Sequence, residues 1–372
     1  MPIRPTLLVF ACALLAAGCS GDNSAGSLGG SSLVPVAAAQ ATAPAGQAGA
    51  SGAVATGTPS TSTAAYALAA KRNGGTPTAS PPPAAGSGVA LGAYVNSGTA
   101  SQSREADVEA LEASMGRKLA IVLHFQGWKS AFPNADETAD ASFGRVPLVS
   151  WNCGDTNANV AAGKDDATID AFAAGMKSYA KPVMLRWFWE MNLSDKNNAR
   201  GVCHDASYDP PGGFDATHFI AAWQHVHDRF VADGVRNVVW LWCPSTGPVA
   251  AANAYYPGSA YVDWVGIDTY DRKNLGVSAT IDAVYPQLTP FAKPIAIAEN
   301  GEHAATAGGN QPAYFASLDA ALRARSQIAA YLYFDANVTS GDDWALDRPA
   351  GVSAFAAFAN GSYEAAPFRA AP

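Results

Sequence analysis

Residues 183–190 of the chain read VMLRWFWE, and residues 294–299 read PIAIAE. Each stretch is largely apolar and closes on a glutamate, Glu190 in the first and Glu299 in the second. A short apolar run of this kind is typical of a parallel strand that is buried on both faces. The two stretches therefore predict buried strands, each of which delivers one carboxyl group to the point where the strand ends.

More runs of the same kind lie before, between and after these two, and helical patterns separate them. The expected strands span residues 89–95, 119–125, 146–151, 183–189, 238–243, 262–268, 294–299 and 328–334. In the intervening segments, apolar residues recur in steps of three and four, as Tyr314, Leu318 and Leu322 do, which predicts amphipathic helices. Strand–helix units repeated over residues 87–365 predict an α/β fold, the closed (β/α)8 TIM barrel.

A doubly wound open sheet is the competing fold for such an alternating pattern. That fold normally carries a Gly-rich phosphate-binding turn after its first strand, and residues 94–98, which read YVNSG, lack one. The barrel is therefore the favoured architecture. Because the reacting groups of such a barrel lie at the carboxyl ends of its strands, Glu190 and Glu299 are the first candidates for chemistry.

Residues 1–19 have the features of a lipoprotein signal peptide. Arg4 supplies a positive charge, residues 7–17 are apolar, and the segment ends with LAAGC at residues 15–19. Small residues before a cysteine resemble a bacterial lipobox, so cleavage would leave Cys19 available for lipidation. The alternative is an ordinary signal peptide with a chance cysteine. Both interpretations predict export, either to a lipid anchor on the bacterial cell envelope or into the medium.

Residues 20–86 consist almost entirely of Ala, Gly, Ser, Thr and Pro. Such a composition cannot bury enough apolar surface to offset chain entropy, so we expect a disordered linker that tethers the folded domain to the membrane. The net charge of the whole chain is −8, and its basic residues form no long runs. Nothing in this charge pattern indicates a nucleic-acid partner, and it suits a monomeric protein that binds a neutral substrate.

Cleavage of a glycosidic bond requires two carboxyl groups, and the two expected strand ends would supply them. One carboxyl protonates the leaving oxygen, and the other meets the developing oxocarbenium ion from the opposite face. We expect Glu190 to be the acid/base and Glu299 the nucleophile, at the spacing of about 5–5.5 Å that gives retention of configuration. Apolar neighbours such as Trp189 are expected to raise the pKa of Glu190 by desolvation.

Arg186 and Tyr270 are the residues expected to support the nucleophile. Arg186 lies two residues before Phe188 and four before Glu190, so strand alternation predicts that all three side chains point into the barrel. There the Arg186 guanidinium would keep Glu299 charged and oriented. Tyr270 follows the sixth expected strand and is placed to donate its hydroxyl to Glu299. An ordinary salt bridge to a loop is the competing explanation for a single strand-end glutamate.

Three stretches resemble glycoside hydrolase family 26, a family of β-mannanases with some β-glucanases and β-1,3-xylanases. They read LRWFWEMN at residues 185–192, YYPG and YVDWVGID within residues 255–268, and KPIAIAE at residues 293–299. The resemblance covers about residues 88 to 360 and implies that Glu190 is the acid/base, Glu299 the nucleophile and Tyr270 its hydrogen-bond partner. It also implies a polysaccharide substrate. The family usually has a histidine where this chain has Trp189.

Further residues at or near the expected strand ends are candidates for binding sugar. Tryptophan rings stack on the C–H face of a sugar, and polar side chains bind its hydroxyls. The stacking candidates are Trp128, Trp151, Trp242 and Trp344, and the polar candidates are His124, Asn192, Asp268 and Asp335. The alternative is that the tryptophans pack the top of the barrel.

The remaining chemistry-bearing residues predict one disulfide and no cofactor or metal. Cys153 and Cys203 fall in expected loops, whereas Cys243 closes an apolar strand, so the first two are the favoured pair, although spacing alone leaves other pairings open. His225 and His227 face different directions on a helix and do not form a zinc site.

A non-catalytic glycan-binding lipoprotein and an enzyme that processes the cell's own exopolysaccharide are the alternative functions.

Overall fold

The structure, a computed structural model, describes residues 88–99, 102–193, 203, 215–247, 252–304, 309–338 and 342–369. The expected signal peptide at residues 1–19, with Cys19, and the whole of the expected linker at residues 20–86 lie outside the described residues. Of the expected domain at residues 87–365, the described residues begin at residue 88, and they continue past its expected end to residue 369.

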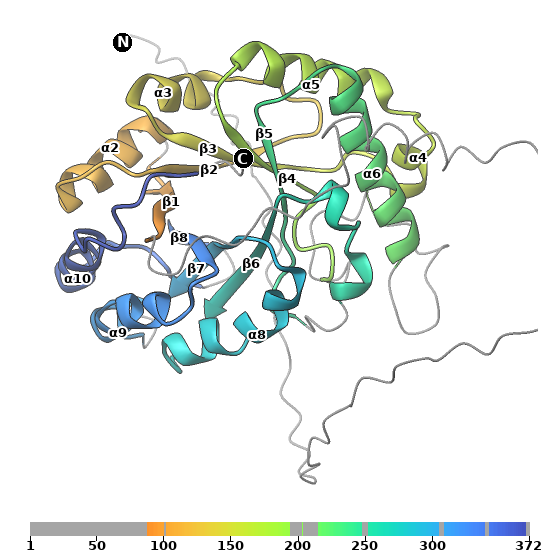
Figure 1. Ribbon diagram of the computed structural model, residues 1–372. Helices are drawn as coiled ribbons and strands as arrows, with labels where there is room; N and C mark the ends of the chain where they lie inside the picture. The colour runs from red at the N-terminus through yellow and green to blue at the C-terminus, as the bar shows by residue number, and fades with distance from the viewer. Residues whose placement is uncertain are drawn as a thin grey trace, which may run out of the picture.

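Eight parallel strands form a closed barrel in chain order (Figure 1). The ring closes between the first and last strands, which pair along their whole length, from Ala90 opposite Ala330 to Asn96 opposite Ala336. The strands are β1 (Ala90–Asn96), β2 (Ile121–Gln126), β3 (Val146–Trp151), β4 (Val183–Trp187), β5 (Val238–Trp242), β6 (Trp264–Asp271), β7 (Ile295–Glu302) and β8 (Ile328–Ala336). This confirms the predicted (β/α)8 barrel, because an open doubly wound sheet has no such closing pair.

Helices surround the barrel and cover its outer face (Figure 1). The longer ones are α2 (Arg104–Met115), α3 (Ala135–Phe143), α5 (Asp166–Tyr179), α6 (Ala216–Ala232), α9 (Gln311–Arg323) and α10 (Pro349–Ala359), and α4 (Asn157–Ala161) and α8 (Tyr285–Leu288) are short. The apolar periods of the sequence become the buried stripes of these helices. In α9, for example, Tyr314, Leu318 and Leu322 are buried against the barrel.

The side chains of the strands form two separate packing layers. One side of each strand faces the barrel interior, which is filled by residues such as Leu123, Met184 and Leu332. The other side faces the helices and holds most of the large aromatic rings. The interior is tight: a Cβ added at Gly266 would lie 2.9 Å from the Sγ atom of Cys243, so the barrel needs a glycine there. The alternation decides which strand-end residues reach the mouth.

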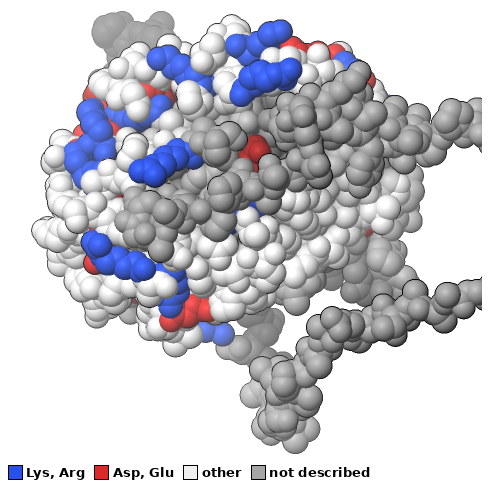
Figure 2. All heavy atoms as spheres, in the orientation of Figure 1, with Lys and Arg blue, Asp and Glu red and all other residues white. Residues whose placement is uncertain are grey.

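Among the described helices, none is both long enough and apolar enough to cross a bilayer. On the face shown in Figure 2, most of the described surface carries no charge, and Lys and Arg side chains occur in separate small groups. This distribution suits the neutral partner that the sequence predicts.

Candidate active site

A bulge in β7 turns Glu299 into the barrel. Along β6 and β7, Ile267 pairs with Ile297 but the next residue, Asp268, pairs with Glu299, so Ala298 is an extra residue in β7. Ala298 packs in the barrel interior, and Glu299 also points inward, where it contacts Arg186. An extra residue of this kind re-aims the side chain that follows it, and such bulges are common beside active sites.

The segment after β4 leaves the strand abruptly and carries Glu190. The strand ends at Trp187, and both Phe188 (φ 44°) and Glu190 (φ 55°) adopt the left-handed region that non-glycine residues rarely occupy. The backbone N–H of Glu190 donates to the Cys243 carbonyl at 2.8 Å, which pins the turn to the end of β5. The Phe188 ring packs against Phe219 of α6, so the prediction that Phe188 points into the barrel is wrong.

Arg186 connects three polar side chains inside the barrel. Its side chain is completely buried, and it donates to the Ser150 hydroxyl at 2.7 Å, to the two Asp268 carboxylate oxygens at 2.8 and 2.9 Å, and to Glu299. Burial alone opposes the positive charge, but Asp268 and Glu299 raise the pKa of Arg186 well above its usual value. The guanidinium is therefore charged and holds both carboxyl groups in fixed orientations.

Tyr270 completes the surroundings of Glu299. Its hydroxyl donates to one carboxylate oxygen of Glu299, while Arg186 donates to the other. Burial and the charge of Glu299 raise the pKa of Tyr270 well above its usual value, so the hydroxyl keeps its proton and remains a donor. Arg186 and Tyr270 thus lie where the sequence analysis expected them, in contact with Glu299.

The charge of Glu190 acts on Glu299. Burial raises the pKa of Glu299 and the negative charge of Glu190 raises it further, whereas Arg186 and the Tyr270 hydrogen bond lower it. Asp268 lies fully buried beneath them, and burial raises its pKa well above the usual value despite its contact with Arg186. The mouth therefore holds two glutamates close enough for the charge of one to change the proton affinity of the other.

Asn192 has a positioning role in this structure. Its side-chain amide donates to the Ser245 carbonyl at 2.9 Å and accepts from the Ser245 N–H at 2.9 Å. This two-way contact ties the segment after β4, which carries Glu190, to the segment after β5. Asn192 is buried, so its predicted contact with a sugar is replaced by a contact that holds the segment of Glu190 in place.

The sequence-based assignment of Trp128, Trp151 and Trp242 as sugar-stacking residues is wrong. Trp151 and Trp242 are completely buried and Trp128 nearly so. Strand alternation puts Trp151 and Trp242 on the helix-facing sides of β3 and β5, where Trp151 stacks on Phe172 of α5 at 4.1 Å between ring centroids. Trp128 stacks on the other tryptophan, Trp151, at 4.4 Å. These rings pack the layer between barrel and helices.

Trp344 and His124 also lack access to a substrate. Trp344 is 1% exposed, and its ring centroid lies 5.0 Å from that of Tyr270, so it supports the Tyr270 ring. His124 faces α3, where its Nε2 atom lies 2.6 Å from a carboxylate oxygen of Asp140. Asp335 faces the helix layer too, and accepts the Leu346 N–H at 2.7 Å. Asp268 and Trp189 do lie beside the candidate residues, in contact with Arg186.

Sequence reasoning missed the aromatic residues that do reach the mouth. Tyr94 of β1, Phe125 of β2 and Phe334 of β8 contact one another, and Phe125 also contacts Trp189 at 5.2 Å between centroids. Each shares the inward side of its strand with a residue of the barrel interior, as Phe125 does with Leu123. Counting every second residue along each strand from these interior residues would have identified Tyr94, Phe125 and Phe334.

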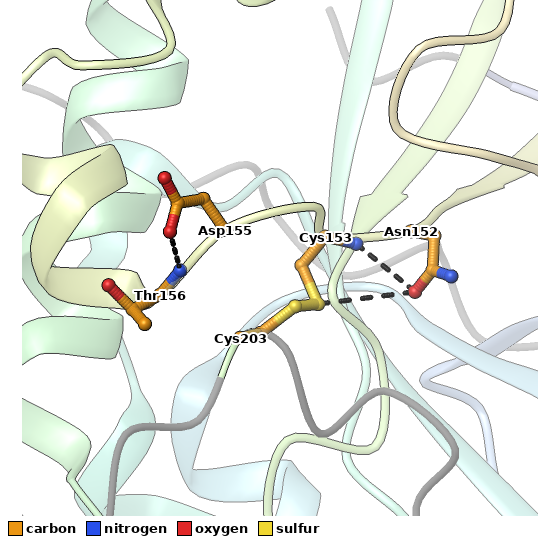
Figure 3. Close-up of a disulfide and its surroundings, with 5 residues drawn as sticks. All are labelled: Asn152, Cys153, Asp155, Thr156 and Cys203. Carbon is orange, nitrogen blue, oxygen red and sulfur yellow. Dashed lines mark hydrogen bonds between the residues drawn. A yellow bond between two sulfur atoms is a disulfide. The ribbon is translucent and has the colours of Figure 1, made fainter.

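The predicted disulfide between Cys153 and Cys203 is confirmed (Figure 3). Their Cα atoms are 5.7 Å apart, and the bond ties the segment after β3 to residue 203, fifty positions further along the chain. Cys243 is the free cysteine of the described residues and is buried beside Asp268 and Arg186. Within the described ranges, no three His, Cys, Asp or Glu residues are arranged to hold a metal ion.

One family model matches part of the chain. Residues 213–360, which include Tyr270 and Glu299, match the model of glycosyl hydrolase family 26. The chain is 28% identical over 288 residues to endoglucanase H of Acetivibrio thermocellus, a match that covers 70% of this chain and 29% of that protein. It is 29% identical over 94 residues to mannan endo-1,4-beta-mannosidase A and B of Caldalkalibacillus mannanilyticus, covering 25% of this chain and 17% of that protein. The chain thus spans less than a third of the length of these relatives.

Solved structures show the same fold. The modular endo-β-1,4-mannanase of Cellulomonas fimi superposes with a TM-score of 0.52 at 19% identity, covering 75% of this chain and 72% of that one. The YdhT protein of Bacillus subtilis superposes with a TM-score of 0.53 at 19% identity, covering 81% and 90%. Similarity at this level of identity concerns the barrel itself.

Proposed function

Because this chain contains a glycosyl hydrolase family 26 domain, we propose that it is a retaining endo-glycosidase that cleaves a β-linked glucan or mannan. Glu190 is the acid/base and Glu299 the nucleophile. The observation that carries the proposal is the environment of Glu299, which has Arg186 on one oxygen, Tyr270 on the other, and the charge of Glu190 close by. The names of the relatives, an endoglucanase and a mannan endo-mannosidase, point to the same substrate classes.

The reaction follows from these contacts in two displacements. Glu190 donates its proton to the oxygen of the leaving chain while Glu299 attacks the anomeric carbon, so that the C–O bond to the leaving chain breaks and a glycosyl ester forms. Glu190, now a carboxylate, takes a proton from water, which attacks the same carbon and releases Glu299. Each displacement inverts the anomeric centre, so the product retains its configuration.

Arg186 and Tyr270 perform distinct tasks in this sequence. The fixed positive charge of Arg186 favours the ionised form of Glu299 that the attack requires, and its hydrogen bonds prevent the carboxylate from rotating. Tyr270 donates to the second oxygen and helps to lower a pKa that burial raises. Because both donors are in place before substrate binds, the nucleophile needs no reorganisation when the bond breaks.

Product analysis tests the proposal directly. The full chain should release oligosaccharides from soluble β-glucan, β-mannan or both, and proton NMR during the first turnovers should show the β-anomer before mutarotation. Release of the α-anomer first would contradict the retaining mechanism. Absence of hydrolysis on β-glucans, β-mannans and β-xylans would contradict the enzyme assignment and favour a glycan-binding protein on the same barrel.

Replacing Tyr270 with phenylalanine should move the acidic limb of the pH profile of kcat/KM to higher pH. The nucleophile acts as a carboxylate, and the Tyr270 hydrogen bond lowers its pKa, so loss of the bond raises the pH at which Glu299 ionises. A hydrogen bond to a charged group is worth about 1.5–3 kcal/mol, so kcat/KM at the optimum should fall about ten- to a hundredfold. Initial rates measured across pH test both effects, and an unmoved acidic limb would contradict the role given to Tyr270.

The cellular setting proposed here rests on the N-terminal sequence. Cleavage before Cys19 and lipidation of that cysteine would anchor the protein to the cell envelope, with residues 20–86 as a tether that lets a monomeric barrel reach polysaccharide outside the membrane. Processing of the cell's own exopolysaccharide is compatible with the same anchor. It differs from foraging in the source of the glycan and leaves the chemistry of the site unchanged.

A further inference from the structure

An arc of aromatic side chains runs around one part of the barrel mouth and connects the surroundings of the two glutamates. In spatial order its members are Trp189, Phe125, Tyr94, Phe334 and Tyr270, with successive ring centroids 5.2, 5.1, 4.6 and 5.8 Å apart. At one end, Trp189 immediately precedes Glu190 in the chain, and at the other end Tyr270 donates to Glu299. A sugar held between the glutamates therefore lies beside this arc.

Phe125 is the member of the arc that is most open to solvent. It is 40% exposed, one of three large hydrophobic residues that are exposed among the described residues. Its exposure is not that of an isolated surface residue, because its ring contacts Tyr94 and Trp189 and lies 6.0 Å from the guanidinium carbon of Arg186. An apolar face is thus exposed directly beside the catalytic machinery, where a bound sugar would displace the water that covers it.

We propose that Phe125 is a sugar-stacking residue and that it makes β-glucan the preferred substrate over β-mannan. This inference rests on the proposed function and specifies the substrate of the same site. The C–H face of a pyranose packs on an aromatic ring, and Phe125 and its neighbour Phe334 carry no polar atom that binds a hydroxyl. The unit against this part of the arc must therefore present C–H bonds alone.

The two candidate polysaccharides differ in this property. In a β-linked glucan, every ring hydroxyl is equatorial, so both faces of each unit present C–H bonds. In a β-mannan, the hydroxyl on C2 is axial and occupies one of the two faces. An axial hydroxyl pressed against Phe125 would lose its water and gain no partner, which is unfavourable. Glucan units stack on Phe125 with either face, whereas mannan units stack with only one.

Each of the two tyrosine hydroxyl groups of the arc makes a hydrogen bond within the protein. The Tyr270 hydroxyl donates to Glu299, and the Tyr94 hydroxyl accepts from the Asn96 amide at 3.4 Å. Neither lies on Phe125 or Phe334, which form the unsubstituted part of the wall. Phe125 and Phe334 therefore select for the shape and apolarity of a sugar face, and polar groups elsewhere in the mouth recognise the individual hydroxyls.

The experiment compares two phenylalanines of equal exposure. Phe125→Ala removes the stacking face, Phe125→Trp keeps one, and Phe143→Ala is the matched control. Phe143 is 42% exposed at the end of α3, where its ring contacts the cations of Lys118 and Arg145 and no residue of the arc. The full chain and each variant are assayed for kcat and KM on soluble β-glucan and β-mannan, after thermal unfolding has shown that all are folded at the assay temperature.

The wild-type protein should prefer β-glucan. Phe125→Ala should lower kcat/KM on β-glucan about tenfold, mainly through KM, which corresponds to about 1.4 kcal/mol of lost binding. Its loss on β-mannan should be smaller, so the preference for β-glucan narrows. Phe125→Trp should recover most of the activity that Phe125→Ala loses, and the control Phe143→Ala should stay within about twofold of the wild type. Hydrolysis with a preference for β-mannan, or with no effect of Phe125→Ala, would overturn this inference and leave the proposed hydrolase activity standing.

A binding measurement separates the stacking role from catalysis. If the wild-type chain hydrolyses no β-glycan, the proposed function fails, and calorimetric titration with a cello-oligosaccharide then decides the role of Phe125. Binding that Phe125→Ala weakens about tenfold, and Phe143→Ala does not, would support stacking on a glycan-binding protein. Equal affinity of the wild type and Phe125→Ala, or no binding by either, would overturn the inference.

Discussion

Replacement of Glu299 by alanine should lower kcat on a β-linked polysaccharide by about four orders of magnitude or more, the scale found when a catalytic nucleophile is removed. No other carboxylate among the described residues is held as Glu299 is, with Arg186 on one oxygen and Tyr270 on the other. Asp268, its nearest acidic neighbour on Arg186, is completely buried and cannot reach a sugar. Steady-state rates on soluble substrate measure the loss.

Azide distinguishes loss of the nucleophile from general damage to the site. With an activated aryl β-glycoside, azide should enter the space vacated in Glu299→Ala and restore turnover, giving a glycosyl azide of inverted, α configuration. Failure of rescue in a folded variant would count against Glu299 as nucleophile. Glu364→Gln is the control, since Glu364 is also buried, has a pKa raised to about 7 by burial, and lies near the β1 end opposite the mouth. It should retain wild-type activity.

Replacement of Glu190 by alanine should lower activity on polysaccharide by about 10²–10⁴-fold but lower the glycosylation step on an aryl glycoside with a good leaving group far less. A leaving group that is stable as an anion needs little protonation, whereas the hydroxyl of a sugar needs a full proton. The measurement is kcat/KM on both substrates. Equal losses on the two would refute the acid role of Glu190.

Azide also separates the two glutamates from each other. In Glu190→Ala, Glu299 still forms the glycosyl ester, and azide then attacks that ester without a general base. The product should be a glycosyl azide of retained, β configuration, the opposite of the Glu299→Ala product. Identical configurations from the two variants would show that the roles assigned to the glutamates are wrong.

The fold was predictable because its signals are repeated many times along the chain. The apolar strand runs and the helical periods recur around the whole ring, so an error of two or three residues at one end, as in β4 or β8, leaves the architecture unchanged. The two carboxylates and their partners Arg186 and Tyr270 were predictable because they stand at strand ends, where a barrel places its reacting groups. The family resemblance added their roles.

The aromatic residues that face the barrel mouth were harder to predict, because the position of a residue along a strand does not say which side of the strand its side chain is on. Trp151 and Trp242 stand at strand ends but on the helix-facing side, whereas Phe125 stands one residue before its strand end and faces inward. A choice based on residue type favoured tryptophan and passed over phenylalanine. Counting alternation from the small or branched residues of the interior would have assigned each side correctly.

Irregular backbone explains the rest. Phe188 was expected to follow the alternation of β4, but the left-handed turn at Phe188 and Glu190 ends the strand and sends the Phe188 ring toward α6. A local departure of this kind depends on the contacts that the turn makes with β5 and with Ser245, which no pattern within residues 183–192 records. The left-handed backbone at Phe188 and Glu190 is therefore recorded by the structure and cannot be predicted from the local sequence.

The extra residue at Ala298 has a consequence for anyone who transplants this centre into an idealised scaffold. In a regular strand, consecutive side chains point to opposite sides, so two inward side chains cannot follow one another. Copying Glu299 without the extra residue Ala298 would therefore point the glutamate at the helices. Deletion scanning along β7 would meet the same obstacle, with a soluble but inert product. A transplanted site therefore needs the β7 bulge as well as the side chains.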